Sequence, residues 1–556
     1  MTTTSDQRNQ ELALAIRHHM EGRYDEAERI YLSLHQKNKQ DEEVLYLLGV
    51  LCCDLGIYAS ACRFIDAALQ ISPQFPEALQ QLGAALLGQA RLDLDADQLD
   101  QAEAGLTRAL NLFPNDAQVL LALGRLALQR GDSASAETLL TRALQQLGDQ
   151  ADGLNWLGLA CLRQKKFVNA EQALRRVLAL QPELNQARNN LGLALYEQGK
   201  LEAARACFAD ALERDAGYAH ARMNLANTLR IMGRPADARD QLETVLNEHP
   251  NSSEALNNLG TVLQDLGMAG QARDCLRRAL ALAPQKPQIR WNLALSQLLL
   301  GEYEEGWANY EARWEGCANL IGAYDKPADL AWRGEDLTGK RLLLWAEQGF
   351  GDTIQFIRFA ERLAQQGATV IAEVQPELRE LLSHALGVDT AVARGQPLPP
   401  YDWHCPLMSL PHWLGATLDD SLSPDAYLHA APDKAAYWRQ QLAGSPGKKI
   451  GLTWAGKSRL QNAELAAVDA RRSIRLTQLE PLLQNTHCSF FSLQKGEPAA
   501  EAHGTSLPLR DFSAEWQDFA DTAAFIANLD LVITVDTAVA HLAGALGKPV
   551  WLLNRH

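Results

Sequence analysis

Residues 188–204 read RNNLGLALYEQGKLEAA, and the pattern returns at 222–238 and 256–272, each time 34 residues further along the chain. Within it, a small residue stands where two helices would cross closely, and a glycine stands where a helix would have to stop. The small residue recurs at Gly49, Gly83, Gly124, Gly158, Gly192, Ala226, Gly260 and Ala294. Every step is 34 residues except a step of 41 after Gly83. Such a period predicts a stack of helical hairpins.

The repeated segment resembles the tetratricopeptide repeat, and the resemblance covers roughly residues 8–315 as eight full hairpins and a divergent ninth. It implies an α-helical superhelix, or α-solenoid, whose concave surface is lined mainly by the first helix of each hairpin. The third repeat carries seven extra residues near ARLDLDADQLD, residues 90–100. We interpret them as a lengthened turn between the two helices of that repeat.

Three aspartates in this insertion, Asp93, Asp95 and Asp97, are spaced as in a calcium-binding loop. Gln98 and Ala104 occupy the sixth and twelfth positions, where such a loop has glycine and glutamate. We therefore expect no metal site in the repeats.

Asparagine recurs on the expected first helix of the last four repeats, two residues before the small residue. The four positions are Asn190, Asn224, Asn258 and Asn292. An Asn amide has both a donor and an acceptor, so four in register can pair with the peptide groups of an extended chain. The arrangement is similar to the asparagine ladder of O-GlcNAc transferases, which implies an acceptor polypeptide bound in the repeat groove. The alternative is that asparagine is simply a common polar residue of the repeat. Against it, the earlier repeats lack asparagine here and carry Leu47, Gln81, Ala122 and Trp156.

The overall composition is that of a folded protein and excludes several classes. The 556 residues carry a formal net charge of −16, which argues against nucleic acid as a partner. The N-terminus, MTTTSDQRNQ, is polar, and no run approaches the roughly 18 apolar residues of a membrane span. Nine cysteines are scattered without a CxxC pair, which favours reduced thiols over disulfides or a zinc site. We therefore expect a cytoplasmic protein with no membrane span.

The helical period ends after the ninth repeat, and an α/β pattern begins near residue 339. Residues 341–346, RLLLWA, are predicted as a buried strand that enters a glycine loop at 347–352 and then an amphipathic helix. A second such pattern starts near Lys448 with KKIGLTWAG, and residues 529–554 again read as strand, loop, helix and strand. Two blocks of alternating strands and helices predict two Rossmann-like halves with parallel sheets.

Four segments resemble motifs of glycosyltransferase family 9, the heptosyltransferase-like enzymes, and particularly bacterial members fused to tetratricopeptide repeats. They are EQGFGDTIQF at 347–356, GLTWAG at 451–456, FFSLQKG at 490–496 and VDTAVAHLAGALGKPVW at 535–551. The resemblance implies a GT-B fold, an inverting transfer from a nucleotide-sugar co-substrate, and no bound metal or other cofactor. One departure follows WAG, where relatives have an asparagine and then a histidine and this chain has KSRLQ.

These patterns divide the chain into four parts. They are a repeat superhelix at 1–315, a connector at 316–338, an N-terminal half of the α/β domain at 339–432 and a C-terminal, nucleotide-sugar-binding half at 433–556. Because relatives continue through a closing helical segment, we expect the last half to be truncated at its end. The N-terminal repeats, which lack the asparagines, are expected to recognise a folded partner or to form a homo-oligomer.

Asp352 is the candidate catalytic base. An inverting transfer needs a base that takes the proton of the acceptor hydroxyl. Asp352 closes the glycine loop at the carboxyl end of a strand, and it matches the position of the catalytic aspartate of the heptosyltransferases. The structural alternative is that Asp352 caps a helix beginning at Thr353.

Glycines, basic residues and a helix start are the candidates for binding the donor. Backbone amides at a glycine loop or helix N-terminus can approach phosphates, and cations stabilise a departing diphosphate. The candidates are Gly349, Gly351, Gly456, Lys457, Arg472, Gln494, Lys495, Asp536, Thr537, Ala538 and His541. The family resemblance implies the roles of Asp536, Thr537 and His541. The ordinary alternatives are a packing role for the histidine and a solvated surface for the basic residues.

Together these features support the hypothesis of a protein O-glycosyltransferase, which transfers a sugar to Ser or Thr of an acceptor protein held in the repeat groove. A first alternative is a repeat scaffold whose glycosyltransferase half is inactive or senses nucleotides. A second is a glycosyltransferase that acts on a lipid-linked or oligosaccharide acceptor, although no basic amphipathic stretch favours membrane docking.

Overall fold

The computed structural model describes residues 4–318, 320–347, 349–417, 426–456, 469–502 and 507–554. The chain forms two compact units, Met1–Ala221 and Arg222–His556. The division falls inside helix α13 (Ala219–Ile231), so the repeat array contributes to both units.

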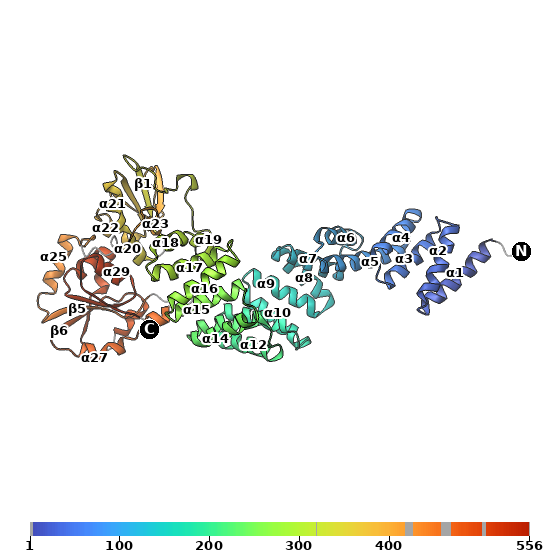
Figure 1. Ribbon diagram of the computed structural model, residues 1–556, viewed down its shortest axis with the longest axis horizontal. Coiled ribbons are helices and arrows are strands. Elements are labelled where there is room, and N and C mark those ends of the chain that lie inside the picture. Colours follow the sequence, from blue (N-terminus) through green and yellow to red (C-terminus); the bar gives the residue numbers. More distant parts are fainter. Residues whose placement is uncertain are drawn as a thin grey trace. The chain divides into compact units, whose positions relative to one another are not determined.

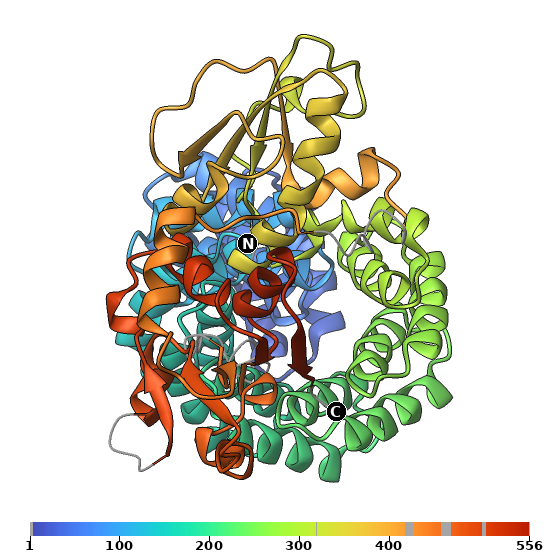
Figure 2. The same cartoon turned by 90° about the vertical axis from the view of Figure 1, so that its left-hand side faces the viewer.

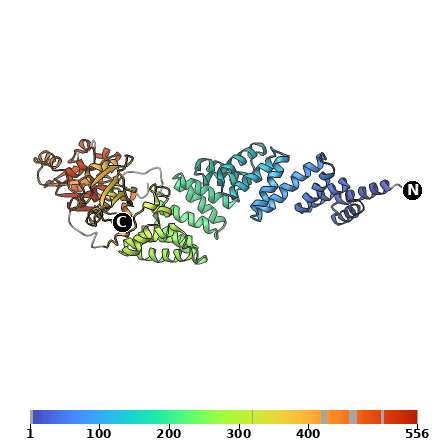
Figure 3. The same cartoon turned by 90° about the horizontal axis from the view of Figure 1, so that it is seen from above.

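The first unit is a stack of helical hairpins, drawn in blue to green in Figure 1. Its helices are α1 (Thr4–Met20), α2 (Tyr24–Lys37), α3 (Glu42–Asp54), α4 (Tyr58–Ile71), α5 (Pro76–Asp95), α6 (Leu99–Leu112), α7 (Ala117–Gln129), α8 (Ser133–Leu147), α9 (Ala151–Arg163), α10 (Phe167–Leu180), α11 (Asn185–Glu197) and α12 (Leu201–Arg214). Figure 3 shows successive hairpins of this unit side by side in chain order. The 34-residue period therefore predicted the helical stack correctly.

Glycines at helix crossings and glycines in turns explain why the repeat length stays at 34 residues. A Cβ at Gly49 would lie 2.3 Å from Ile65 Cγ1, and one at Gly192 would lie 2.5 Å from Phe208 Cε1, so the helices of a hairpin cross too closely for a side chain there. Gly56, in the turn between two helices, has a φ of 73°, which side chains rarely tolerate. Both predicted roles of glycine, at a close helix crossing and in a turn, are therefore confirmed within single hairpins.

The third repeat differs from its prediction. Its seven extra residues lengthen the first helix, α5, to 20 residues, whereas α3 has 13. The turn after α5 stays short, and Asp97 takes the left-handed conformation there with a φ of 58°. Asp93 lies within the helix, where it is buried and accepts a hydrogen bond from Gln89 Nε2 at 2.7 Å. The insertion adds about two helical turns, so the lengthened turn we expected is wrong.

The second unit begins with the remaining repeats and continues into the α/β domain. Its helical hairpins are formed by α13, α14 (Pro235–Glu248), α15 (Ser253–Asp265), α16 (Ala269–Leu282), α17 (Pro287–Leu299), α18 (Tyr303–Tyr310) and the short α19 (Arg313–Gly316). The domain that follows has two parallel sheets, visible as separate groups of arrows in Figure 2. This confirms the predicted order of a helical solenoid followed by an α/β domain.

The first sheet has the strand order β3-β2-β1-β4 and the second has the order β7-β6-β5-β8-β9. The strands are β1 (Arg341–Trp345), β2 (Thr369–Val374), β3 (Thr390–Ala393), β4 (Trp403–Pro406), β5 (Lys448–Thr453), β6 (Cys488–Ser492), β7 (Leu509–Asp511), β8 (Leu531–Val535) and β9 (Val550–Leu553). The principal helices are α20 (Phe350–Phe356), α21 (Ala360–Gln365), α22 (Arg379–Leu382), α23 (Leu410–Trp413), α25 (Pro432–Gln441), α27 (Glu480–Leu483), α28 (Phe519–Ile526) and α29 (Ala538–Ala545). In each sheet, later strands are added first on one side of the first strand, β1 or β5, and then on its other side. Such a reversal leaves a crevice at the carboxyl end of that first strand, where ligands of α/β proteins bind.

The last repeat shares one hydrophobic core with the α/β domain. Ala294 of α17 and Tyr310 of α18 belong to the same buried cluster as Leu344 of β1. The ring of Trp307, on α18, meets the ring of Phe356, on α20, edge to face with centroids 5.7 Å apart. The end of the repeat array is therefore packed directly against the first helix of the α/β domain.

Candidate functional site

The first glycine loop leads from β1 into α20. Asp352 lies in the first turn of this helix, where a backbone amide of the loop holds its carboxylate. Gly349 is the residue that caps α20, and Asp352 lies in the first turn. The Gly349 N–H donates to Asp352 Oδ2 at 3.1 Å. The alternative in which Asp352 itself caps a helix beginning at Thr353 is therefore wrong, because α20 starts earlier, at Phe350. The carboxylate still satisfies a backbone amide of the helix start.

Asp352 and His541 lie in helices that follow strands of different sheets, and these helices pack together. A Cβ at Gly351 would lie 2.7 Å from His541 Cδ2, so the imidazole rests on the backbone of the first glycine loop. His541 lies on α29, which packs against α20. Burial raises the pKa of Asp352; the Gly349 N–H and His541 oppose this rise, and Asp536 adds to it. The structure thus brings these predicted residues into one cluster.

The segment between the two halves also holds α20 and α29 together. The Tyr427 hydroxyl donates to Ile354 O, on α20, at 3.1 Å. The Tyr427 N–H donates to Ala545 O, the last residue of α29, at 3.1 Å. The guanidinium carbon of Arg358 lies 4.5 Å from the centre of the Tyr427 ring. These contacts hold α20 and α29 next to each other.

Strand β8 leads into α29 through Asp536 and Thr537, as the sequence predicted. Thr537 has extended backbone angles, with φ −144° and ψ 170°, and precedes Ala538, the first helical residue. The Thr537 hydroxyl lies 3.1 Å from Thr534 Oγ1 and makes no hydrogen bond to the amides of α29. The first turn of this helix, at the carboxyl end of a parallel strand, can therefore turn its amides toward an anion.

The second glycine loop follows β5 and is packed by an arginine. A Cβ at Gly456 would lie 2.7 Å from an Nη atom of Arg472, so the guanidinium covers the loop backbone. Arg472 is held in place by Asp469, with an N···O distance of 2.8 Å. The Gly456 N–H donates to Ser473 Oγ at 3.2 Å. Gly456 and Arg472 are thus neighbours, whereas Lys457 lies outside the described residues.

The side-chain amide of Gln494 is bonded to the backbone of this loop through both its oxygen and its nitrogen. Its Oε1 accepts from the N–H groups of Trp454 and Ala455 at 3.1 and 2.9 Å. Its Nε2 donates to the carbonyls of Ala455 and Lys495 at 2.9 and 3.1 Å. Since Gln494 is also buried, the contact with the nucleotide that we expected is not what this geometry provides. Gln494 instead positions the loop of the second half.

Lys495 is exposed, but its ammonium group is bonded to another part of the protein. Lys495 Nζ donates to Trp516 O at 2.6 Å and lies 5.9 Å from the centre of the Trp516 ring. Direct contact of Lys495 with the nucleotide requires the side chain to leave this partner. The two residues at the exit of β6 are thus oriented toward protein groups.

The four asparagines differ in exposure, which the sequence did not indicate. Asn190 is 7% exposed and Asn292 is 3% exposed, whereas Asn224 and Asn258 are half-buried. Asn292 Nδ2 donates to Asn257 Oδ1, on the preceding repeat, at 2.9 Å. The expectation that Asn292 offers a free amide to a bound peptide is therefore wrong, because the side chain is buried and its Oδ1 also accepts from Gln288 Nε2 at 3.4 Å.

Residues 469–472, which are helical, also contact the repeats that carry the asparagines. Arg471 donates to Arg230 O at 3.5 Å, and its Nη2 lies 3.8 Å from Asp265 Oδ1. Asp265 also pairs with Arg230 at 3.2 Å. Arg230 lies near the end of α13, the helix that carries Asn224. The described helical residues 469–472 therefore contact both the second glycine loop, through Arg472, and the repeat array, through Arg471.

A buried ion pair that sequence reasoning missed lies just before the first glycine loop. Arg313 of α19 and Glu347 after β1 contact each other with an Nε···Oε2 distance of 2.8 Å, and neither side chain is exposed. The available signal was a charged residue placed directly after a buried strand, since a carboxylate there needs a partner. The sequence did not reveal that the partner comes from the repeats.

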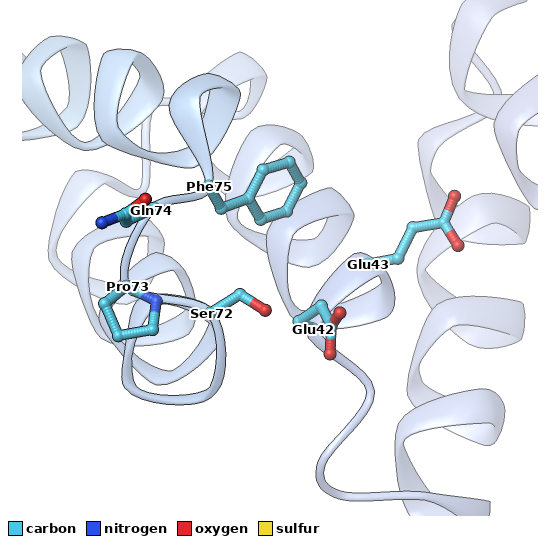
Figure 4. A pocket seen from close by; sticks show the side chains of 6 residues that line it. All are labelled: Glu42, Glu43, Ser72, Pro73, Gln74 and Phe75. Atoms are coloured by element: carbon cyan, nitrogen blue, oxygen red, sulfur yellow. The ribbon is translucent and has the colours of Figure 1, made fainter.

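The first unit has a surface pocket of its own, shown in Figure 4. It is lined by Glu42, Glu43, Ser72, Pro73, Gln74 and Phe75. The two glutamates begin α3, and the other residues join α4 to α5. Glu43 pairs with Arg8 at 2.9 Å, and the Phe75 ring packs on Tyr46 with centroids 4.9 Å apart. None of the predicted site residues lines this pocket.

Within the part of the chain that the structure describes, no helix is long and apolar enough to cross a membrane. Among the same residues, no three His, Cys, Asp or Glu side chains are grouped as metal ligands.

Comparisons with known proteins agree with both parts of the chain. Tetratricopeptide repeat models match residues 11–32, 87–152, 121–185, 195–261 and 257–313. The model of glycosyltransferase family 9 (heptosyltransferase) matches residues 517–553, which contain β8, α29 and β9. Protein FlbA of Caulobacter vibrioides is 29% identical over 285 residues, which cover 46% of this chain and 46% of FlbA. The chain therefore spans just under half the length of that relative.

Two solved structures are similar to the repeats. A tetratricopeptide repeat protein from Parabacteroides merdae is 19% identical, with a TM-score of 0.35, over 46% of this chain and 99% of that protein. PilF from Pseudomonas aeruginosa is 19% identical, with a TM-score of 0.34, over 40% of this chain and 99% of PilF. The matched repeat models place tetratricopeptide repeats in the N-terminal part of the chain, and residues 517–553 are similar to glycosyltransferase family 9.

Proposed function

We propose that this protein is an inverting glycosyltransferase, which transfers a sugar from a nucleotide-sugar to a Ser or Thr hydroxyl of an acceptor protein. The observation that carries the proposal is the meeting of Gly351 and Asp352, after β1, with Asp536 and His541, after β8. Ligands of parallel α/β sheets bind outside the carboxyl ends of the strands, where these residues stand. The family 9 match at residues 517–553 supports a sugar donor as that ligand.

The proposed reaction uses Asp352 as its base. The acceptor oxygen attacks the anomeric carbon, the bond from that carbon to the nucleoside diphosphate breaks, and Asp352 takes the hydroxyl proton. A raised pKa makes Asp352 a stronger base than an ordinary aspartate, which suits this task. Attack from the face opposite the leaving group inverts the anomeric centre.

The departing diphosphate needs positive potential, and the second half supplies candidates for it. The amides at the start of α29 and the guanidinium of Arg472 are proposed to stabilise the leaving group, with Lys457 as a further cation. No bound metal is part of this scheme. A chelator should therefore leave the transfer rate unchanged.

The acceptor is proposed to lie along the repeats of the second unit. Asn224 and Asn258 are the half-buried asparagines there, and Arg471 connects their helices to the donor side. The N-terminal repeats are proposed to recognise a folded partner or a second copy of the chain. All nine cysteines are free thiols, which fits a cytoplasmic location.

Replacing the base tests the proposal directly. Asp352→Asn should abolish sugar transfer to a co-expressed acceptor protein, measured as added mass by intact mass spectrometry. Binding of a nucleoside diphosphate, followed by its effect on thermal unfolding, should persist. Asp336→Asn is a matched control, because Asp336 is an exposed carboxylate of the connector that bonds to Thr338. Undiminished turnover by Asp352→Asn would remove Asp352 from the role of base.

A second candidate function is a scaffold that binds nucleotides without transferring sugar. It is favoured by the internal hydrogen bonds of Gln494 and Lys495, which leave neither side chain turned toward a ligand. Such a protein would show a stabilising shift with a nucleoside diphosphate but no added mass on any co-expressed acceptor. A chain that transfers sugar excludes this candidate.

A further inference from the structure

The end of the repeat array places an arginine inside the α/β domain. Arg313 is the first residue of α19, and its side chain is completely buried, as is that of Glu347. Arg313 Nε lies 2.8 Å from Glu347 Oε2, and Nη2 lies 3.0 Å from Glu347 Oε1. The two side chains form a bidentate ion pair, the geometry that favours arginine over lysine.

The remaining polar atoms of the pair are also bonded. Arg313 donates to Glu311 Oε1 and to Ser409 Oγ, each at 2.7 Å. Glu347 Oε1 accepts a second hydrogen bond, from the Met408 N–H, at 3.0 Å. Burial would lower the pKa of Arg313, but Glu347 and Glu311 raise it above its usual value. The guanidinium therefore stays charged and holds the carboxylate in a single orientation.

Glu347 leads directly into the loop that carries the proposed base. Gly349 caps α20 two residues later, and its N–H donates to Asp352 Oδ2. Met408, the other partner of Glu347, follows β4, the strand that pairs with β1. The ion pair thus ties the exits of two neighbouring strands to the repeat array at the point where the glycine loop begins.

We propose that Arg313 is a positioning residue for Asp352, so that the last turn of the repeat array is a working part of the catalytic site. This inference rests on the proposed role of Asp352 as base. Arg313 acts through Glu347 and the backbone of the glycine loop, and it touches no substrate. Loss of Arg313 leaves Glu347 buried without its counter-ion, and because burial already raises the pKa of this carboxyl, Glu347 then takes up a proton. Without the two bonds to the guanidinium, the segment that leads into α20 is no longer held to the repeat array.

The test uses three variants of the full chain: Arg313→Met, Glu347→Gln and the double variant Arg313→Met/Glu347→Gln. For Arg313→Met we expect hydrogen exchange of the peptide covering 349–356 to rise at least tenfold. We expect kcat to fall at least tenfold, while the Kd for a nucleoside diphosphate and the KM for the acceptor change less than threefold. A defect confined to kcat is the signature of a misplaced base, because a general loss of folding would affect binding as well.

The double variant separates positioning from stability. It leaves no unpaired charge in the core, so its unfolding temperature should recover toward the wild-type value. Its kcat and its exchange at 349–356 should stay impaired, because the bidentate link is absent. Recovery of kcat together with unfolding temperature would show that Arg313 only stabilises the fold. Glu347→Gln, which keeps the shape of the side chain, provides the same comparison if Arg313→Met does not fold.

Arg277→Met is the matched control from the same end of the array. Arg277 forms exposed ion pairs with Glu302 and Glu305 at 3.1 and 2.9 Å, so its loss should change neither exchange at 349–356 nor kcat. The exchange measurement also stands apart from the proposed function. If the wild-type chain transfers no sugar, the function fails, whereas unchanged exchange in Arg313→Met overturns the positioning role whatever the activity.

Discussion

His541 lies with its imidazole on the backbone of Gly351, so that a Cβ at position 351 would come within 2.7 Å of Cδ2 and 3.2 Å of Nε2. The two residues are far apart in the chain and lie in helices that follow strands of different sheets. Their contact joins the loop after β1 to the helix after β8. Any residue larger than glycine at position 351 must therefore displace the histidine or separate the two halves.

We expect Gly351→Ala to lower kcat/KM at least tenfold, because the added methyl group pushes His541 away from Asp352. Steady-state kinetics with an acceptor protein would measure this loss. In a His541→Ala background the methyl group has room, so Gly351→Ala should then cause little further loss. If the effects of the two changes on kcat/KM were additive, the loss in Gly351→Ala would not arise from the contact with His541.

Gly544→Ala is the control for that experiment, because it lies on the same helix as His541. A Cβ at Gly544 would meet nothing within 4 Å. Alanine also favours a helix over glycine by roughly 1 kcal/mol. We expect Gly544→Ala to keep full activity and to unfold at the same or a slightly higher temperature.

The pH dependence of the reaction should report the environment of Asp352. Burial raises its pKa above the ordinary value, and only the ionised carboxylate can accept a proton. The acid limb of the kcat/KM profile should therefore lie above the pKa of about 3.9 of an unperturbed aspartate. An acid limb at or below that value would contradict the buried setting of this residue.

The same shift predicts an effect on stability. A carboxyl whose pKa is higher in the folded than in the unfolded protein favours folding below the unfolded pKa, and this contribution is lost as pH rises through the folded pKa. Asp352→Asn should therefore be more stable than wild type near pH 7, and the difference should shrink as pH falls toward 4. Thermal unfolding of both proteins over this range would measure it. A destabilised Asp352→Asn variant at pH 7 would indicate that the Gly349 hydrogen bond outweighs burial.

Gln494→Ala should destabilise the C-terminal half rather than merely weaken nucleotide binding. Four backbone groups lose their partner, among them the buried N–H groups of Trp454 and Ala455, and the total cost is on the order of 3 kcal/mol. Calorimetry would show a lower unfolding temperature. The exposed Gln484, replaced by Ala, serves as control. If Gln494→Ala kept its unfolding temperature and lost only nucleotide affinity, the residue would be a direct donor contact.

The asparagines should separate into two classes. Asn224→Ala/Asn258→Ala removes two half-buried amides, and at about 1 kcal/mol each this corresponds to a roughly 30-fold higher KM for the acceptor. Asn292→Ala breaks the bond to Asn257, so it should instead lower stability by about 1 kcal/mol and leave that KM unchanged. Equal effects of all three on acceptor binding would restore the continuous ladder.

The repeats were predictable because their contacts are local. Gly49 contacts Ile65 and Gly192 contacts Phe208 within single hairpins, so the residues that specify each hairpin lie within one 34-residue segment. The strand that begins at Arg341 and its glycine loop were predictable for the same reason. The length of α5 was not predictable from the sequence. Seven extra residues can either extend a helix by two turns or lengthen the loop after it, and packing against neighbouring helices decides between the two.

The sequence by itself determined the helical stack, the α/β order and the strand-to-helix segments that carry Asp352 and His541. The tertiary structure decided which of these residues meet. The contact of Gly351 with His541, the four hydrogen bonds of Gln494 and the ion pair of Arg313 with Glu347 join segments that are separate in the chain. A repeat period or a motif indicates which residues contact each other within one hairpin or one strand-to-helix segment. Burial and charge pairing between elements depend on how the elements pack, and that is where the site acquires its geometry.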